Sequence, residues 1–328
     1  MSLKINQSLS SSEILYVSFN QDYGCFACGT INGFKIFNIV PFSEIFRRNF
    51  VSGGIGIIEM LYRCNIVALV GGGNVPKFPP NTVMIWDDHK LRCIAEIKFA
   101  SNVCAVKLRR DRIVVVLENK IYVYNLSDVR LLDTINTAPN PEGIIALCPL
   151  YDIKKSAVIN AHSSPLQCIA LSTDGTRIAS ASIKGTIIRI FDTETGLLLE
   201  ELRRGKEKAT MYSMAFSQHG DYLACTSSRN TLHIYKLKES SVRNQDINDI
   251  KNEKNKFSFS KLMTSNICKY SFTEPGKFIC AFSSDDSCVV VLTSKGNLYH
   301  ITYKDNKCEC LYSSKFIDDT DNISSLVQ

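Results

Sequence analysis

Apolar and polar residues alternate in short runs along most of the chain. Alternation with a period of two is typical of half-buried β-strands, and the Gly, Asn, Asp and Ser residues between the runs are typical of tight turns. No amphipathic helix longer than three turns is evident, so the predicted fold class is all-β. The clearest predicted strands are Ile14–Phe19, Gly33–Ile39, Thr82–Trp86, Arg112–Leu117, Ile121–Leu126, Thr186–Phe191, Thr231–Leu237 and Cys288–Leu292.

Several of these segments repeat one another. Leu166–Asp192 aligns without a gap on Met211–Leu237, and Ile14–Ile39 and Ile267–Ile301 are looser copies. Each copy has the order strand, turn, strand, turn, strand, which is the plan of a WD40-type propeller blade with a period of about 40–45 residues. The Trp-Asp dipeptide that gives such repeats their name occurs at Trp86.

The spacing of the repeats predicts the number of blades. The aromatic residues that end the third strands are regularly spaced, except that the interval from Tyr124 to Phe191 is too long for one blade and too short for two. This interval contains two short predicted strands, Gly143–Leu147 and Ser156–Ile159, so we infer an abbreviated fourth blade. With it, residues 1–328 are predicted to form a single seven-bladed β-propeller, whose closure hides the strand edges.

A polar, charge-rich segment, residues 238–256, is predicted to be a mobile loop of the sixth blade. The Phe-Ser alternation of Phe257–Met263 after it has two interpretations. It is either the fourth strand of that blade, which we favour, or an apolar tip that enters a membrane. Lysines near an anionic surface contribute about 1 kcal/mol each, and the predicted membrane contacts are Lys251, Lys254, Lys256 and Phe257.

The composition narrows the classes of protein. With 45% hydrophobic residues and a net charge of +6, the chain is an ordinary globular protein, and the charge does not indicate a nucleic-acid partner. No run of 18 apolar residues is present, so no transmembrane helix is predicted. The 13 cysteines are scattered in apolar runs and no export signal is evident, so we expect reduced, buried thiols in a cytoplasmic protein.

No motif of an enzyme or of a metal site is evident. The nucleophile-elbow, zinc-protease and phosphate-loop patterns are absent. Cys25 and Cys28 form one C-x-x-C pair, but on a strand residues three apart face opposite sides, and no second pair completes a zinc site. We therefore predict a protein that is not an enzyme and that has no catalytic residue, metal or cofactor.

The strongest candidate for ligand binding lies between the two clearest repeats. Arg203 and Arg204 are adjacent, so in an extended chain they point to opposite sides and can serve two separate pockets. Hydroxyl and cationic side chains recur near both repeats, and such groups donate hydrogen bonds to phosphate oxygens. They are Ser182, Lys184, Thr186 and Arg189 in one repeat, and Ser227, Arg229, Thr231 and His233 in the other. Alternatively, the arginines form surface ion pairs with Glu200, Glu201 or Glu207, and the hydroxyls only close turns.

At these residues the sequence resembles the PROPPIN family of phosphoinositide-binding β-propellers, whose signature is Phe/Leu-Arg-Arg-Gly. The resemblance rests on Leu202–Gly205, Gly71–Asp88 and Ala138–Leu147. It implies a seven-bladed propeller that binds phosphatidylinositol 3-phosphate and phosphatidylinositol 3,5-bisphosphate at two rim sites. It also implies a non-enzymatic role in autophagy and endolysosomal membrane traffic.

The resemblance assigns the candidate residues to these two sites. Site 1 consists of Arg203, Ser182, Lys184, Thr186, Arg189 and His162. Site 2 consists of Arg204, Ser227, Arg229, Thr231 and His233, with Thr210 and Ser228 as further candidates. This chain has Leu202 where Phe is commoner and Asn230 where relatives often have Gly, so the turn of site 2 differs from the family pattern.

The resemblance also implies a location and partners. We expect a monomeric cytoplasmic protein that is peripheral on phagophore, endosomal or vacuolar membranes. Its expected partners are membranes containing the two phosphoinositides and an autophagy protein, either a lipid-transfer protein or the conjugation machinery, with no nucleic acid. The alternative function is a generic WD40 protein-interaction scaffold without lipid binding.

Overall fold

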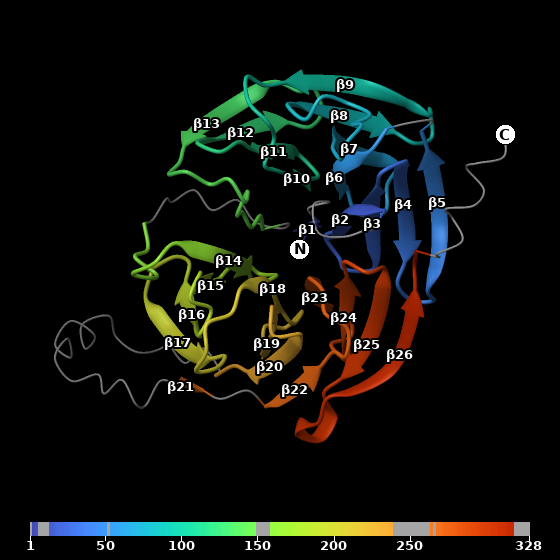
Figure 1. Ribbon diagram of the computed structural model, residues 1–328. Helices are drawn as coiled ribbons and strands as arrows, with labels where there is room; N and C mark the ends of the chain where they lie inside the picture. The colour runs from blue at the N-terminus through green and yellow to red at the C-terminus, as the bar shows by residue number, and fades with distance from the viewer. Residues whose placement is uncertain are drawn as a thin grey trace.

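The described part of the chain forms six β-sheets arranged around a common axis, like the blades of a propeller (Figure 1). Among the described residues, the strand pairs are antiparallel except for β17 with β21. We number the sheets I to VI in chain order. The computed structural model describes residues 2–5, 13–50, 53–148, 158–238, 263–264 and 267–317.

The strands follow one another in the sheets almost in chain order. Sheet I comprises β1 (Ser2–Lys4), β2 (Ile14–Phe19), β3 (Cys25–Thr30), β4 (Gly33–Asn38) and β5 (Ser43–Asn49). Sheet II comprises β6 (Ile55–Met60), β7 (Ile66–Gly71), β8 (Thr82–Asp87) and β9 (Arg92–Lys98), and sheet III comprises β10 (Ala105–Arg109), β11 (Arg112–Val116), β12 (Lys120–Asn125) and β13 (Leu131–Asn136).

The last three sheets contain the clearest repeats. Sheet IV comprises β14 (Leu166–Leu171), β15 (Arg177–Ser182), β16 (Ile187–Asp192), β17 (Leu198–Arg203) and β21 (Met263–Thr264). Sheet V comprises β18 (Met211–Phe216), β19 (Tyr222–Ser227), β20 (Thr231–Lys236) and β22 (Cys268–Ser271). Sheet VI comprises β23 (Phe278–Phe282), β24 (Cys288–Thr293), β25 (Asn297–Thr302) and β26 (Glu309–Lys315), with a 3-10 turn at Lys304–Asn306.

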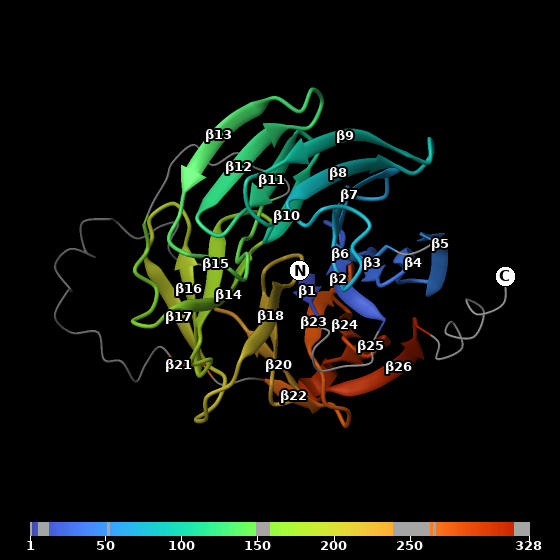
Figure 2. The ribbon, with the colours of Figure 1, turned by 45° about the horizontal axis from the view of Figure 1, so that its top comes forward.

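Each sheet runs from the axis of the ring to its outside. In both views the strands β6, β10, β14, β18 and β23 lie nearest the axis, and β9, β13, β17 and β26 lie outside (Figures 1 and 2). The N-terminal strand β1 adds an extra inner strand to sheet I, with Leu3 opposite Val17 of β2. The start of the described chain therefore lies in the centre of the ring.

Apolar side chains from facing sheets form the core. Ile188 and Ile190 of sheet IV, for example, share a fully buried cluster with Met214 and Phe216 of sheet V. Burying one such side chain contributes about 1.5–3 kcal/mol to folding. Other clusters join sheets I, II and III, sheets VI and I, and sheets V and VI. Packing of neighbouring blades therefore holds the propeller together, as the alternating pattern predicts.

Among the described residues, the predicted abbreviated fourth blade contributes no sheet. Sheets IV, V and VI correspond to the predicted fifth, sixth and seventh blades, and the described residues 137–148 and 158–165 between sheets III and IV contain no strand. Gly143–Leu147 therefore has no strand partner there, and Ser156–Ile159 lies partly outside the described residues. A strand is stable only beside another strand, and the described residues 137–148 and 158–165 supply no such pair.

The fourth strand of the predicted sixth blade is not the one that we favoured. In sheet V this position belongs to β22, in which Tyr270 lies opposite Leu232 of β20. β22 also alternates apolar and polar residues, and it occupies the edge of β20 that Phe257–Met263 was expected to occupy. Met263–Thr264 instead pairs with β17 of sheet IV. Residues 239–262, which contain most of the predicted loop and all the predicted membrane contacts (Lys251, Lys254, Lys256 and Phe257), lie outside the described residues.

The expectation that all thiols are reduced is also wrong. Cys268 of β22 forms a disulfide with Cys308, which joins sheet V to the segment that precedes β26 of sheet VI. The two residues are 40 positions apart in sequence, so only the packing of neighbouring sheets brings them together. The other 11 cysteines are free. Cys25 and Cys28 pack in different hydrophobic clusters, on opposite faces of β3, as predicted.

Candidate functional site

Arg203 and Arg204 lie at the end of β17 and project to opposite sides of sheet IV. Leu202 is fully buried between sheets IV and V. Because side chains alternate along a strand, Arg203 projects from the other face, opposite Ile187 of β16, and is exposed. Arg204 follows on the side of Leu202, and only 8% of its surface is exposed. One guanidinium therefore lies on each side of the sheet.

Backbone carbonyl groups hold the Arg204 guanidinium in place. Its Nε donates a hydrogen bond of 2.5 Å to the carbonyl oxygen of Gly185, and its Nη2 donates to that of Glu207. The main-chain N–H of Arg204 donates to the Thr186 carbonyl oxygen at 2.9 Å. Within the described ranges no carboxylate pairs with this guanidinium, so its positive charge is not neutralised between sheets IV and V.

The turn between β15 and β16 positions one of these carbonyl groups. Gly185 has φ of +59°, a left-handed conformation that favours glycine. A Cβ atom at this position would lie 1.8 Å from the Ala209 carbonyl oxygen. The Gly185 N–H closes the turn by donating to the Ser182 carbonyl oxygen at 2.8 Å. The absence of a side chain thus lets the turn pack directly on the loop that follows β17.

A chain of polar side chains on sheet V faces sheet IV beside Arg204. Ser227 and Thr231 lie opposite each other on β19 and β20, with their hydroxyl oxygens 3.4 Å apart. The Thr231 hydroxyl oxygen lies 3.2 Å from Nε2 of His233. Tyr235, on the same face of β20, donates its hydroxyl hydrogen bond to the Arg203 carbonyl oxygen at 3.2 Å. All four side chains are buried.

The His233 imidazole is neutral at pH 7. Burial, together with the nearby cations Lys269 and Arg204, lowers its pKa to about 4. Its Nδ1 is buried and has no hydrogen-bond partner among the described residues. The ring therefore has an unused polar atom beside a buried cation, which is an arrangement that an oxygen-rich ligand can satisfy.

Arg229 lies at the exposed end of the same group. It follows β19 and forms an ion pair with the Glu207 carboxylate, and its Nη2 lies 3.5 Å from the Lys208 carbonyl oxygen. Thr210 and Ser228 lie nearby at the ends of β18 and β19 of sheet V, where the Thr210 N–H donates to the Ser228 hydroxyl at 3.0 Å. The structure therefore brings the predicted site 2 residues Arg204, Ser227, Arg229, Thr231 and His233 to one end of the interface between sheets IV and V.

On the other face of sheet IV, Arg189 is paired with Glu201. The sequence analysis had considered this carboxylate as a partner for Arg203 or Arg204. The Arg189 Nε lies 2.7 Å from Oε1 of Glu201, and its Nη1 donates to the Ala161 carbonyl oxygen at 2.7 Å. His162 lies close by, with Nε2 3.1 Å from the Ser180 hydroxyl, and burial lowers its pKa. Arg189 of β16 lies opposite Glu201 of β17, two residues along from the Ile187–Arg203 pair. Arg189 and Arg203 therefore project from the same face of sheet IV.

The remaining site 1 residues lie around the turn from β15 to β16. Ser182 is the buried last residue of β15, Lys184 is exposed in the turn, and the Thr186 carbonyl group accepts the Arg204 N–H. The structure therefore places Ser182, Lys184, Thr186 and Arg203 at the turn end of sheet IV, whereas Arg189 and His162 lie further along the sheet.

The sequence did not reveal the groups that hold the candidate cations. Glu201 neutralises Arg189, Glu207 pairs with Arg229, and the Gly185 carbonyl group fixes Arg204. Backbone carbonyl groups leave no signal in a sequence, because every residue has one. The sequence analysis considered Glu200, Glu201 and Glu207 only as ion-pair partners for Arg203 and Arg204. Among the described residues, neither arginine forms an ion pair with one of these carboxylates. The part of the chain that the structure describes contains no cluster of metal-ligating side chains.

Sequence comparison identifies similar proteins. A family model described as PROPPIN matches residues 13–152 and 148–264. Autophagy-related protein 18e of Arabidopsis thaliana is 36% identical over 255 residues, which cover 71% of this chain and 68% of the relative. Autophagy-related protein 18 of Komagataella pastoris is 32% identical over 297 residues, which cover 73% of this chain and 54% of the relative. The match thus spans about half to two thirds of these relatives.

Comparison of structures identifies the same fold. Hsv2p of Kluyveromyces lactis has a TM-score of 0.74 at 22% identity, covering 92% of this chain and 98% of that one. KlAtg21, solved in complex with the coiled coil of AgAtg16, has a TM-score of 0.73 at 23% identity and covers 94% and 100%. The related propellers have seven blades, one more than the six sheets described in this chain.

Proposed function

Because this chain belongs to the PROPPIN family of non-enzymatic effectors, we propose that it binds 3-phosphorylated phosphoinositide headgroups at two sites on the rim of the propeller. The ligands are phosphatidylinositol 3-phosphate and phosphatidylinositol 3,5-bisphosphate. The observation that carries the proposal is the divergence of Arg203 and Arg204 to opposite faces of sheet IV. Bound to such membranes, the protein serves as a peripheral scaffold in autophagy and endolysosomal traffic.

The chemistry of the proposed second site fits a phosphate group. The Arg204 guanidinium donates in a planar fork, which matches two phosphate oxygens. Ser227, Thr231 and neutral His233 add hydrogen-bond donors without adding negative charge. The guanidinium is anchored by carbonyl groups at Gly185 and Glu207, so it is already ordered before a ligand arrives. An ordered site loses less entropy on binding.

The proposed first site is less completely assembled in the free protein. Arg203 and Lys184 are exposed at the turn end of sheet IV, whereas Arg189 is paired with Glu201. We propose that Arg203, Lys184, Ser182 and Thr186 provide the direct contacts to a headgroup. Arg189 and His162 then define the wall of this site. A site with more exposed cations is expected to bind more weakly and with a steeper dependence on salt.

Attachment to a membrane combines these two sites. Two weak sites on one rigid rim bind a membrane much more tightly than either site alone, because the second contact is intramolecular. Lys251, Lys254, Lys256 and Phe257 are proposed to add contacts with the bilayer surface, each cation contributing about 1 kcal/mol. Weak contacts that act together allow the protein to dissociate when the headgroups are removed.

Flotation with liposomes tests the proposal. The wild-type protein is expected to float with vesicles that contain phosphatidylinositol 3-phosphate and to remain unbound with vesicles that lack phosphoinositides. Changing both Arg203→Thr and Arg204→Thr is expected to reduce binding at least tenfold. The matched control is Arg47→Thr with Arg130→Thr, which removes the same charge from two exposed positions on other sheets. Equal flotation of the two double variants rejects the proposal.

A second candidate function is protein scaffolding without lipid recognition. It is favoured by one observation, namely that the structural relative KlAtg21 was solved with a coiled coil bound. In this second function, we propose that a coiled-coil autophagy protein is the partner of this chain. If the wild-type protein fails to float with any phosphoinositide yet binds a coiled-coil partner, scaffolding alone is the correct function.

A further inference from the structure

The fourth strand of sheet V has polar side chains on the face of the proposed second site. Cys268 of β22 is buried in the cluster that joins sheets V and VI. Because side chains alternate along a strand, Lys269 projects from the opposite face, towards sheet IV. Lys269 lies opposite His233 of β20. The neighbouring pair on this face is Ser271 opposite Thr231. Lys269 and Ser271 are both exposed, and neither is among the residues that the sequence predicts for a site.

These two pairs continue rows of polar side chains that cross sheet V. Ser227, Thr231 and Ser271 lie in one row across β19, β20 and β22, at the turn end of the sheet. In the next row Lys269 follows His233. Directly paired residues on one face of a sheet have their Cβ atoms about 4.5–5.5 Å apart. The polar face that contains the proposed second site therefore extends from β19 and β20 onto β22.

The positive charge of Lys269 is not neutralised within the described chain, where no carboxylate forms an ion pair with it. The charges that act on the His233 ring are those of Lys269 and Arg204, and both are positive. Glu200 is buried on the facing side of sheet IV, but its Oε2 accepts the Lys238 N–H at 3.3 Å, past the end of β20. Two cations from different sheets therefore act on one neutral ring, whose buried Nδ1 has no partner in the described chain.

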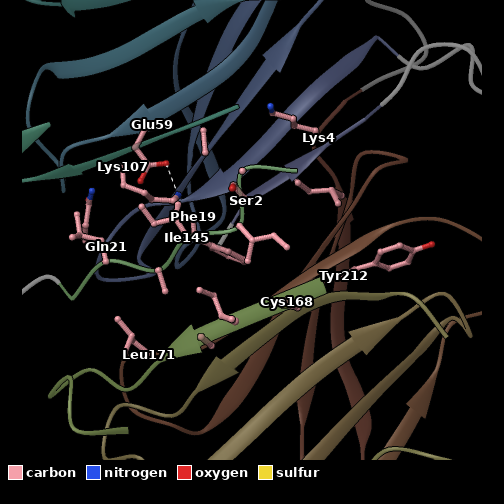
Figure 3. Close-up of a pocket in the computed structure, with 18 of the residues that line it drawn as sticks. Ser2, Lys4, Phe19, Gln21, Glu59, Lys107, Ile145, Cys168, Leu171 and Tyr212 are labelled. Atoms are coloured by element: carbon pink, nitrogen blue, oxygen red, sulfur yellow. Dashed lines mark hydrogen bonds and ion pairs between the residues drawn. The ribbon is translucent and has the colours of Figure 1, made fainter. Parts of the chain in front are cut away.

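Elsewhere in the protein, a lysine near buried groups is neutralised by a carboxylate. In the cavity at the inner strands of the ring, Lys107 Nζ lies 2.9 Å from Oε2 of Glu59. Figure 3 shows this ion pair at the edge of the cavity. Both side chains are largely buried, and each cancels the charge of the other. Lys269 lacks such a partner in the described chain, so an anion from outside can supply one.

The two repeats differ in charge at the position of Lys269. Arg189 of β16 and His233 of β20 are equivalent, because each pairs with an aligned residue of the two repeats, on β15 and β19. Their neighbours on the fourth strands are Glu201 in sheet IV and Lys269 in sheet V. In sheet IV the pair is a cation with a carboxylate, 2.7 Å apart. In sheet V it is a neutral ring with a cation, so this row has a net positive charge only in the proposed second site.

We propose that Lys269 is a further headgroup contact of the second site and makes this site favour phosphatidylinositol 3,5-bisphosphate over phosphatidylinositol 3-phosphate. This inference rests on the proposed function of the site. Arg204 holds one phosphate in its planar fork, and Lys269 and Ser271 contact the other. The cation on β22 is additional to the groups that complete a site for one phosphate. Of the two proposed ligands, only the bisphosphate has a second anionic group to pair with it.

The opposite face of β22 holds Lys269 in position. The Cys268–Cys308 disulfide joins β22 to the segment before β26. Cys268 also packs in the apolar cluster between sheets V and VI. The backbone of Lys269 is therefore ordered before a ligand arrives, and only its side chain has to be immobilised on binding.

Isothermal titration calorimetry of the full chain with the water-soluble dibutanoyl forms of the two lipids tests the proposal. Every protein carries Arg203→Thr, so that only the second site is measured. In this background, Lys269→Gln is expected to lower the affinity for the bisphosphate by about tenfold or more and for the monophosphate by less than about threefold. The matched control is Lys236→Gln, which removes the same charge from an exposed position on the other face of β20. It is expected to leave both affinities unchanged.

The two lipids together separate failure of this inference from failure of the proposed function. Retained binding of the monophosphate by Lys269→Gln shows that the variant is folded and that its loss is specific to the second phosphate. An equal loss for both lipids, or an unchanged affinity for the bisphosphate, overturns the role of Lys269 and leaves the proposed function standing. If the protein without any substitution binds neither lipid, the proposed function fails and this inference fails with it.

Discussion

His233 is the buried residue whose charge state is most informative about the site. Its Nε2 lies 3.2 Å from the Thr231 hydroxyl oxygen, the positive charge of Arg204 acts on it, and 6% of its surface is exposed. A protonated imidazole there would be both desolvated and repelled by Arg204 and Lys269. The neutral ring is therefore the form that the fold stabilises. A hydrogen bond to phosphate from this residue does not depend on its taking up a proton near neutral pH.

This protonation equilibrium predicts a pH dependence of stability. In the unfolded chain His233 takes up a proton near its ordinary pKa of 6.5, but in the folded protein only near 4. The unfolded state therefore binds more protons between these values, and stability falls as the pH falls from about 6.5 to about 4, by about 1.4 kcal/mol per unit at most. Urea unfolding at pH 7, 6 and 5 measures this loss. His233→Gln, which does not titrate, is expected to show a shallower fall, and an identical slope would contradict the assignment.

At the scale of an element, the turn from β15 to β16 controls the geometry around Arg204. Its residues were predicted to be ligands because of their side chains. In the structure the turn also acts through its backbone, since the Gly185 carbonyl group fixes the guanidinium. The turn can approach the loop after β17 only because residue 185 has no Cβ atom.

Two glycines near Arg204 make a matched test of this turn. Gly185→Ala is expected to lower the free energy of unfolding by about 2 kcal/mol or more, because a left-handed residue with a side chain is strained and the new atom meets Ala209. Gly205→Ala, where nothing lies within 4 Å of the added atom, is expected to change it by less than about 1 kcal/mol. Chemical denaturation measures both values. Equal destabilisation would show that the turn does not depend on Gly185.

The alternation of strand residues explains which parts of the site the sequence could predict. The divergence of Arg203 and Arg204 follows from the period of two and is consistent with the burial of Leu202, so the sequence alone predicted it. The pairing of Arg189 with Glu201 depends on the register between β16 and β17, which includes a bulge. A register shift of one residue would move every side chain to the other face, and periodicity alone does not determine it.

At the scale of the whole molecule, one covalent bond joins two blades. The Cys268–Cys308 disulfide connects β22, the outer strand of sheet V, to the chain just before β26. β22 has only four residues, so its position depends on few backbone hydrogen bonds. The disulfide therefore fixes the edge of sheet V against sheet VI, opposite the face that contains the proposed lipid site.

Reduction of this disulfide is expected to destabilise the propeller. A crosslink that closes a loop of 40 residues limits the freedom of the unfolded chain and contributes about 2–4 kcal/mol. Unfolding by urea with and without dithiothreitol measures this contribution. The double variant Cys268→Ser and Cys308→Ser is the control, because its unfolding should not respond to dithiothreitol. If the wild-type protein does not respond either, the bond does not stabilise the fold.

The sequence by itself determined the all-β class, the propeller repeat and the two arginines, because these depend on local alternation and on the similarity of one blade to the next. The tertiary structure alone decided which strand completes sheet V, where Cys268 finds Cys308, and that the stretch between sheets III and IV builds no sheet in the described chain. Each of these depends on which distant segments compete for one edge or face. A local pattern specifies that a strand can form, but its partner is chosen by packing across the whole ring.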